Sequence, residues 1–311
     1  MNSDARYILE LESRCTNDDP EAMYILGREL YQGDRVKQDI QRAVDLIRRS
    51  AEMGFADSEY TYGYFLCEGI GVTTDKVAAI KWYRKAANQG CVEAQYGLGY
   101  MCDKGEGVNV NKMEAAKWYH LAASNGHPGA QCNLGILYFN GWGVRLDKDE
   151  AFRLFTEAAG NGNLDAMFNL GRMYEVGDGV EKDDREALKY YSEAATKGDG
   201  NALLSIGVRY LTGDGVPVDT VLAFKMLLAS ADKGNAEAQY RIGMMYYNGV
   251  GVIKDFYAAA SLLKKSAMSW NENAIFTLGL MHLNGEGFPK DERKGNALIR
   301  FAADLSGIDG S

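Results

Sequence analysis

Proline and histidine are scarce in this chain, and long hydrophobic runs are missing. The 311 residues include four prolines and three histidines. Nowhere do about 18 apolar residues follow one another, the length that a membrane-spanning helix needs, so we expect no insertion into a membrane. The first residues also lack the basic segment and apolar run of a secretion signal, so none is expected.

Basic side chains are also in deficit. The chain carries 43 acidic and 34 basic residues, a formal net charge of −9, and no cluster of Lys and Arg in the sequence. Nucleic-acid phosphates attract proteins that present clustered Lys and Arg, so DNA or RNA is not an expected partner. The 46% hydrophobic content is near a globular average and predicts a folded, soluble chain rather than a disordered one.

Disulfide and zinc patterns are missing as well. The five cysteines, Cys15, Cys67, Cys91, Cys102 and Cys132, are odd in number, irregular in spacing and confined to the first half. Free thiols in a reducing compartment suit this usage better than a disulfide framework, which predicts a cytoplasmic location. No Cys-x-x-Cys or His-x-x-x-His spacing is present, so we expect no metal site.

Cofactor and catalytic patterns are equally absent. Gly-x-Gly sequences occur, but a dinucleotide or phosphate loop needs a single copy after a strand, whereas these recur at a fixed spacing after helical patterns. We therefore expect no cofactor, no catalytic residue and no enzyme. One alternative stays open, in which Cys102 and a histidine of an adjacent helix form a nucleophile and its base.

Glycine, in contrast, is abundant and periodic. The chain has 36 glycines, and one of them, usually preceded by an aliphatic residue, recurs every 36 residues without an insertion. Each copy keeps a small residue five positions before this glycine and often a tyrosine three positions after it. An internal repeat of this period is the signature of a solenoid. The repeat glycines are Gly27, Gly63, Gly99, Gly135, Gly171, Gly207, Gly243 and Gly279.

Each repeat predicts two helices. The first begins near a cap such as Asp19 or His127, each followed by a proline that is tolerated at the first helical position. It ends at the Gly-x-Gly turn. The second begins at an Asp or Asn cap and ends at a glycine such as Gly54 or Gly90, typical of left-handed helix ends. Three repeats add a predicted capping box, Asn111 with Glu114, Asp147 with Glu150 and Asp183 with Glu186.

The repeat glycine lies in mid-helix, where glycine costs about 0.5–1 kcal/mol relative to alanine. Close approach of a second helix would compensate for that cost. We expect the small residue of the second helix, such as Ala43 or Ala151, to face this glycine. One helix pair cannot bury both of its faces, so stacked pairs would share a continuous core.

These patterns predict an all-α fold, an α/α superhelix or solenoid of eight helix-turn-helix repeats. The apolar stripe of Tyr7, Ile8, Leu11 and Cys15 predicts a capping helix within residues 1–18. The polar tail is expected at 306–311. The repeats are predicted at 19–54, 55–90, 91–126, 127–162, 163–198, 199–234, 235–270 and 271–305, forming one solenoid.

The segment Ala130 to Val144, followed by Asp147, Ala151 and Ala158, resembles the Sel-one-like repeat (SLR) family, which is related to tetratricopeptide repeats but has a longer turn between helices. The resemblance covers residues 19–305. It implies a non-catalytic adaptor or scaffold that binds partner proteins or peptides.

Two other functions remain open by the same resemblance. One is a dedicated immunity protein that neutralises a single toxin or effector. The other, an enzyme, is a protein that binds or hydrolyses β-lactams, but the paired cysteines of that branch are missing here. The resemblance therefore favours the adaptor.

The first helices should line the concave face of such a superhelix. Residues one and four positions after each repeat glycine point away from the expected core, and eleven of these sixteen are large and apolar or aromatic. They predict a hydrophobic groove for a partner segment, although a tightly wound solenoid could partly bury the same face. The predicted contacts are Tyr64, Tyr100, Ile136, Phe139, Arg172, Glu175, Val208, Leu211, Met244, Tyr247, Leu280 and Leu283.

Within this set, Tyr64, Tyr100, Phe139 and Tyr247 are the expected anchors. Arg172 and Glu175 lie three residues apart on one helix. Such a spacing most often makes a local ion pair worth about 0.2–0.5 kcal/mol. We therefore expect that pair to be structural rather than part of the binding site.

Overall fold

A computed structural model describes residues 3–305 and 307. All regular secondary structure of these residues is α-helical. The predicted tail at 306–311 therefore lies outside the described residues, apart from Gly307. The helices are α1 (Ser3–Thr16), α2 (Pro20–Gln32), α3 (Ile40–Glu52), α4 (Ala56–Glu68), α5 (Lys76–Asn88), α6 (Val92–Lys104), α7 (Lys112–Ser124), α8 (Pro128–Asn140), α9 (Lys148–Gly160), α10 (Leu164–Val176), α11 (Asp184–Thr196), α12 (Gly200–Thr212), α13 (Thr220–Asp232), α14 (Ala236–Asn248), α15 (Phe256–Met268), α16 (Glu272–Asn284) and α17 (Glu292–Leu305).

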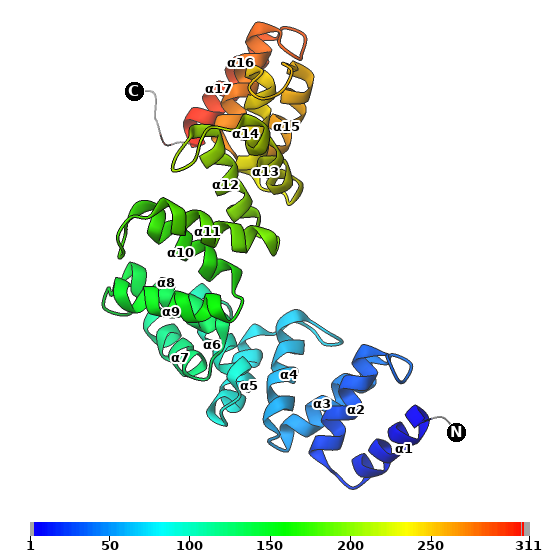
Figure 1. Ribbon diagram of the computed structural model, residues 1–311. Coiled ribbons are helices and arrows are strands. Elements are labelled where there is room, and N and C mark those ends of the chain that lie inside the picture. Colours follow the sequence, from blue (N-terminus) through cyan, green and yellow to red (C-terminus); the bar gives the residue numbers. More distant parts are fainter. Residues whose placement is uncertain (1–2, 306, 308–311) are drawn as a thin grey trace. The chain divides into compact units, whose positions relative to one another are not determined.

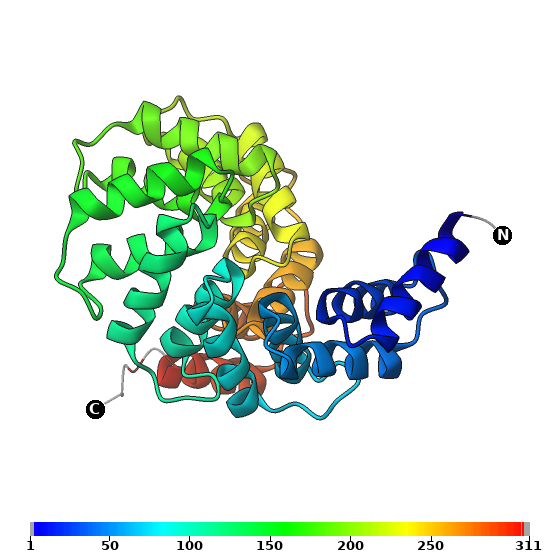
Figure 2. The ribbon, with the colours of Figure 1, turned by 90° about the horizontal axis from the view of Figure 1, so that it is seen from below.

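The chain divides into two compact units, Met1–Asn163 and Leu164–Ser311. The first contains α1 to α9 and the second contains α10 to α17. These helices are labelled in Figure 1. Inside each unit, consecutive helices lie side by side, in the view of Figure 2 as in that of Figure 1. The continuity of one solenoid along all eight repeats stays a prediction.

Two layers of helices build each unit. Every first helix packs on the second helix of its own repeat, which in turn packs on the first helix of the next repeat in the unit. Neighbouring second helices are also linked directly, since Arg84 of α5 donates to Glu114 of α7 at 2.9 Å. Neighbouring first helices are linked at their starts, where Nε2 of His127 lies 3.2 Å from Glu93.

The helix ends follow the predicted signals, with one correction. Asn111, Asp147 and Asp183 each accept a hydrogen bond from the backbone N–H three residues on, as a capping box requires. The reciprocal bond is not formed. The backbone N–H of each cap instead donates to a carbonyl of the preceding helix, as Asp147 does to Tyr138 at 3.0 Å. The glutamates of the three boxes are free to pair with basic side chains.

The repeat glycines do lie at close helix contacts. In five repeats the predicted small residue faces the glycine with its backbone carbonyl, but in all eight a large side chain lies closer. A Cβ atom at Gly135 would lie 2.8 Å from the ring of Phe155, and one at Gly207 would lie 2.7 Å from Leu227. The small residue contributes its carbonyl, as Ala223 does 3.2 Å from the same position. The glycine therefore makes room for a large side chain. The eight side chains above the repeat glycines are Ile47, Tyr83, Tyr119, Phe155, Tyr191, Leu227, Leu263 and Ile299.

The tyrosine position of the repeat is buried in some copies and half-buried in others. The buried residues are Leu30, Leu66, Cys102 and His282, and the half-buried ones are Tyr138, Tyr174, Tyr210 and Tyr246. The residue one position earlier is buried in every repeat. In six repeats it is apolar and at most 2% exposed: Phe65, Met101, Leu137, Met173, Met245 and Met281.

The N-terminal helix α1 closes one end of the first unit, as its apolar stripe predicts. Ile8, Leu11 and Cys15 are buried against α2 and α3. Tyr7, the fourth residue of that stripe, is 36% exposed and lies under the guanidinium of Arg35. The stripe therefore covers the first repeat with three residues rather than four.

Candidate functional site

The first helices of the first unit expose two tyrosines at equivalent positions. Tyr64 of α4 is 40% exposed and Tyr100 of α6 is 38% exposed. Both follow a repeat glycine directly. Ile136 has the same place on α8 and is half-buried. These residues form the part of the predicted surface that is most open to solvent in this unit.

The corresponding residues of the second unit are mostly half-buried. Arg172 of α10 is exposed, whereas Val208, Met244 and Leu280 are half-buried. Val208 packs against a core cluster that contains Leu227. Of the four positions in this unit, only that of Arg172 is open.

The residues four positions after the repeat glycines serve packing more than solvent contact. The ammonium of Lys148 lies 5.4 Å from the ring centre of Phe139. Leu283 approaches Gly295 of α17, where an added Cβ atom would lie 2.7 Å away. Leu211 packs on the same core cluster as Val208. The residues four positions after the repeat glycines therefore agree with the alternative in which the solenoid partly buries its own concave face.

Tyr247 is tied to the next repeat. Its hydroxyl donates to Glu286 at 2.7 Å, and its ring meets Phe256 with a centroid distance of 5.3 Å. Burial, followed by the bond to Glu286, raises the pKa of Tyr247. Of the four predicted anchors, Tyr64 and Tyr100 are the exposed ones, while Phe139 and Tyr247 are half-buried.

The predicted ion pair between Arg172 and Glu175 is not formed. Glu175 lies 3.2 Å from the guanidinium of Arg209 and accepts a hydrogen bond from the hydroxyl of Tyr191 at 2.6 Å. Arg172 is exposed and belongs to no ion pair in the part of the chain that the structure describes. The carboxylate of Glu175 therefore pairs with the buried Arg209 of the next repeat and not with the exposed Arg172 of its own helix.

Arg209 is the residue that sequence reasoning missed. Its side chain is 3% exposed and also pairs with Asp184 at 3.1 Å. The residue occupies the buried position that is Phe, Met or Leu in six other repeats. The sequence did contain a signal for this site, because Arg209 is a charged residue at a repeat position that is apolar in six repeats. In the remaining repeat this position is Glu29, which pairs with Arg35.

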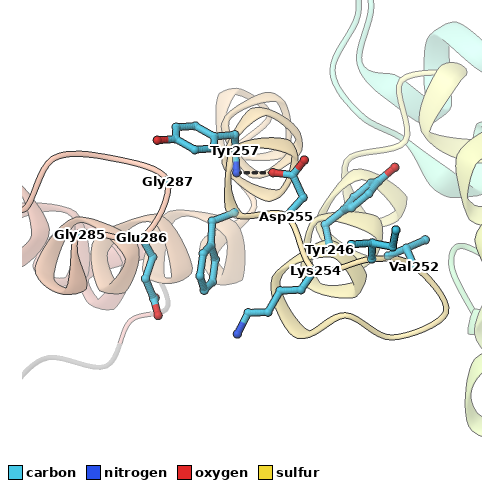
Figure 3. Close-up of a pocket in the computed structure, with 10 residues that line it drawn as sticks. Tyr246, Val252, Lys254, Asp255, Tyr257, Gly285, Glu286 and Gly287 are labelled. Atoms are coloured by element: carbon cyan, nitrogen blue, oxygen red, sulfur yellow. Dashed lines mark hydrogen bonds between the residues drawn. The ribbon is translucent and has the colours of Figure 1, made fainter.

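A surface hollow of about 820 Å³ is lined by Tyr246 of α14 and by the turns that follow α14 and α16. Figure 3 shows Lys254, Asp255 and Glu286 around it. Asp255 caps α15 by accepting from the N–H of Tyr257 at 2.8 Å. Because Glu286 is held by Tyr247, both carboxylates of this hollow already have structural bonds.

The alternative of a cysteine nucleophile finds no support from geometry. Cys102 is 1% exposed, and burial raises the pKa of its thiol, which disfavours the reactive thiolate. His127 is used as a helix cap, since its Nδ1 accepts from the N–H of Ala130 at 3.1 Å, and its ring stacks on Tyr96. All five cysteines are free thiols.

Among residues 3–305 and 307, no group of three or more His, Cys, Asp or Glu side chains is arranged to hold a metal ion. Over the same residues, no helix is both long enough and apolar enough to cross a membrane.

The Sel1 repeat matches the chain eight times, at residues 20–55, 56–91, 92–127, 128–163, 164–199, 200–235, 236–269 and 273–306. Among solved structures, the chain is similar to a protective antigen of uropathogenic Escherichia coli with an SLR fold, at 33% identity and a TM-score of 0.79. That match covers 96% of this chain but only 64% of the antigen.

A Sel1 repeat protein from Oxalobacter formigenes is similar at 32% identity and a TM-score of 0.70, over 96% of this chain and 86% of that one. No curated protein matches the chain.

Proposed function

Since the chain belongs to the Sel1 repeat family, we propose that it is a non-catalytic adaptor that binds a partner protein or peptide through its first helices. Tyr64 and Tyr100 would make the main contact. What supports this proposal is their exposure, 40% and 38%, at the same position of consecutive repeats. Large aromatic side chains are frequent hot spots of protein interfaces.

The tyrosine pair belongs to a wider aromatic surface. Tyr60 and Tyr96 lie one helical turn before Tyr64 and Tyr100, and both are half-buried. Their rings are held in place by Tyr83 and Tyr119, at centroid distances of 5.5 and 6.0 Å. Rings fixed by packing lose little entropy on binding, which favours an interface.

The test is co-purification from native extract, followed by mass spectrometry. The double variant Tyr64→Ala, Tyr100→Ala should lose the partner that the unaltered protein retains. Tyr257→Ala is the matched control, because Tyr257 is a tyrosine with 78% exposure on a second helix. Retention of the same partners by the double variant, or their loss from the Tyr257 control, would contradict the proposal.

The same experiment separates the alternatives. A single stoichiometric partner would favour the dedicated immunity protein over a general adaptor. A nitrocefin assay separately tests for β-lactam hydrolysis. The free state of all five cysteines fits our proposal of a cytoplasmic location, where thiols stay reduced.

A further inference from the structure

Positive charge gathers on two neighbouring second helices of an otherwise acidic chain. Helices α5 and α7 together carry six basic side chains and one acidic side chain, Glu114, whereas the whole chain has a net charge of −9. The sequence itself has no basic cluster. The fold brings these basic side chains together, because α5 and α7 lie side by side although α6 separates them along the chain.

Half of these basic side chains already have carboxylate partners. Lys76 pairs with Glu106, Arg84 with Glu114 and Lys112 with Asp103, all within 3 Å. Lys85 acts on Glu59 through its charge. Lys81 and Lys117 form no ion pair in the described part of the chain. Lys81 and Lys117 occupy the same position of consecutive repeats, so α5 and α7 present two equivalent free ammonium groups.

Apolar side chains accompany these lysines on the surface. Val77 of α5 is 56% exposed, and Met113 and Leu121 of α7 are 61% and 45% exposed. Met113, Lys117 and Leu121 follow one another at intervals of four residues, so they form one ridge along α7. We call the surface made by Val77, Lys81, Met113, Lys117 and Leu121 the basic face.

Two hollows flank the ridge of α7, and its three residues line both of them. The first, of about 390 Å³, is also lined by Trp118 and by Glu114, which is paired with Arg84. The second, of about 580 Å³, is also lined by Leu134, Tyr138 and Val144. Both are lined mainly by apolar groups, so each could receive an apolar side chain with a lysine at its rim.

We propose that the basic face binds an amphipathic segment of a partner protein that carries carboxylates next to large apolar side chains. The apolar side chains enter the two hollows, and the carboxylates pair with Lys81 and Lys117. The charge complementarity selects an acidic partner, since no carboxylate of residues 3–305 forms an ion pair with these two lysines. The basic face belongs to the second helices and is therefore separate from the tyrosine surface of the first helices.

The test uses a fluorescein-labelled helical peptide of about 16 residues, four turns long, with leucines on one side and glutamates beside them. Its twin has lysine in place of every glutamate. Fluorescence anisotropy should detect binding of the glutamate peptide only. Binding should weaken as salt is raised, since ions screen exposed charges.

Variants locate the binding. Lys81→Glu with Lys117→Glu should weaken the glutamate peptide at least about 10-fold, because charge pairs become like charges. Lys225→Glu with Lys265→Glu is the matched control and should change the affinity less than about twofold, since these lysines lie on other second helices. Lys225 occupies the same repeat position as Lys81 and Lys117. Met113→Ser should also weaken binding, whereas Val221→Ser, at the equivalent position of α13, should not.

Several results would overturn the proposal. Equal affinity for the two peptides, or an unchanged affinity in the Lys81, Lys117 variant, would exclude an acidic segment on this face. Self-association that the same variant abolishes would assign the face to a second copy of the chain. Binding to phosphatidylserine vesicles without binding to the glutamate peptide would assign it to a lipid surface.

Discussion

The ring of Phe155 lies directly over Gly135, at the place where any other residue would put its Cβ atom. The two residues come from the two helices of one repeat, α8 and α9. Seven other repeat glycines have a large side chain in the same relationship. The glycine is thus the residue that lets the helices of a pair approach each other.

Replacing Gly135 by valine should therefore destabilise the protein by more than about 1–3 kcal/mol through overpacking. Gly160→Ala is the control, because Gly160 is a helical glycine with open space where its Cβ atom would be. That variant should keep or raise stability by up to about 0.5–1 kcal/mol. Urea denaturation followed by circular dichroism measures both, and equal midpoints for the two variants would contradict the packing described here.

The buried ion pairs of Arg209 predict an asymmetric response to mutation. Arg209→Met, which restores the residue type of other repeats, should change stability by less than about 1 kcal/mol, because Glu175 and Asp184 are about one-third exposed and water can solvate them once the guanidinium is gone. Removing both carboxylates with Glu175→Ala and Asp184→Ala leaves a buried guanidinium unpaired and should cost about 3–5 kcal/mol. The free energies of unfolding of the two variants can be compared by chemical denaturation. A strongly destabilised Arg209→Met variant would show that the charges hold this repeat together.

Trp270 has a left-handed backbone, with φ of 62°, where six other repeats have glycine. Such a conformation costs a non-glycine residue about 1–2 kcal/mol. Trp270→Ala and Trp270→Gly both lose the contact of the indole with Phe301, but only the glycine variant removes the strain. We expect Trp270→Gly to be the more stable of the two by about 1 kcal/mol. Equal melting temperatures would contradict this.

His282 should make stability depend on pH. The side chain is buried, its Nδ1 has no hydrogen-bond partner, and burial lowers its pKa. The unfolded chain then binds the proton more readily, so stability should fall as the pH drops below about 6.5, the unperturbed histidine pKa. His282→Leu, the residue that Leu30 and Leu66 provide at this position, should flatten the profile between neutral and acidic pH. Parallel profiles for the two proteins would exclude the effect.

The repeat period made much of the fold predictable. Caps such as Asp19 and turn glycines such as Gly33 depend on local backbone geometry, which a single sequence records. The large residue above each repeat glycine was missed because its position varies between Tyr, Phe, Leu and Ile.

Partners across repeats could not be predicted in the same way. Glu175 has Arg172 within one helical turn, yet it binds Arg209, which lies 34 residues further on. Periodicity shows which residues are equivalent, but it does not select among side chains that meet from neighbouring repeats. Tyr64 and Tyr247 were both expected to be anchors, but Tyr64 is exposed and Tyr247 is half-buried. Periodicity did not show that Tyr247 meets a side chain of the next repeat.

The most direct test of the adaptor proposal is calorimetric titration of the co-purified partner into the purified protein. Tyr64→Ala and Tyr100→Ala should each cost more than about 2 kcal/mol of binding free energy, as interface hot spots do. Phe139→Ala should cost less, because its side chain is half-buried and offers a partner less surface than Tyr64 or Tyr100. Binding by the Tyr64, Tyr100 double variant with the affinity of the unaltered protein would contradict the assignment of the first helices as the contact surface.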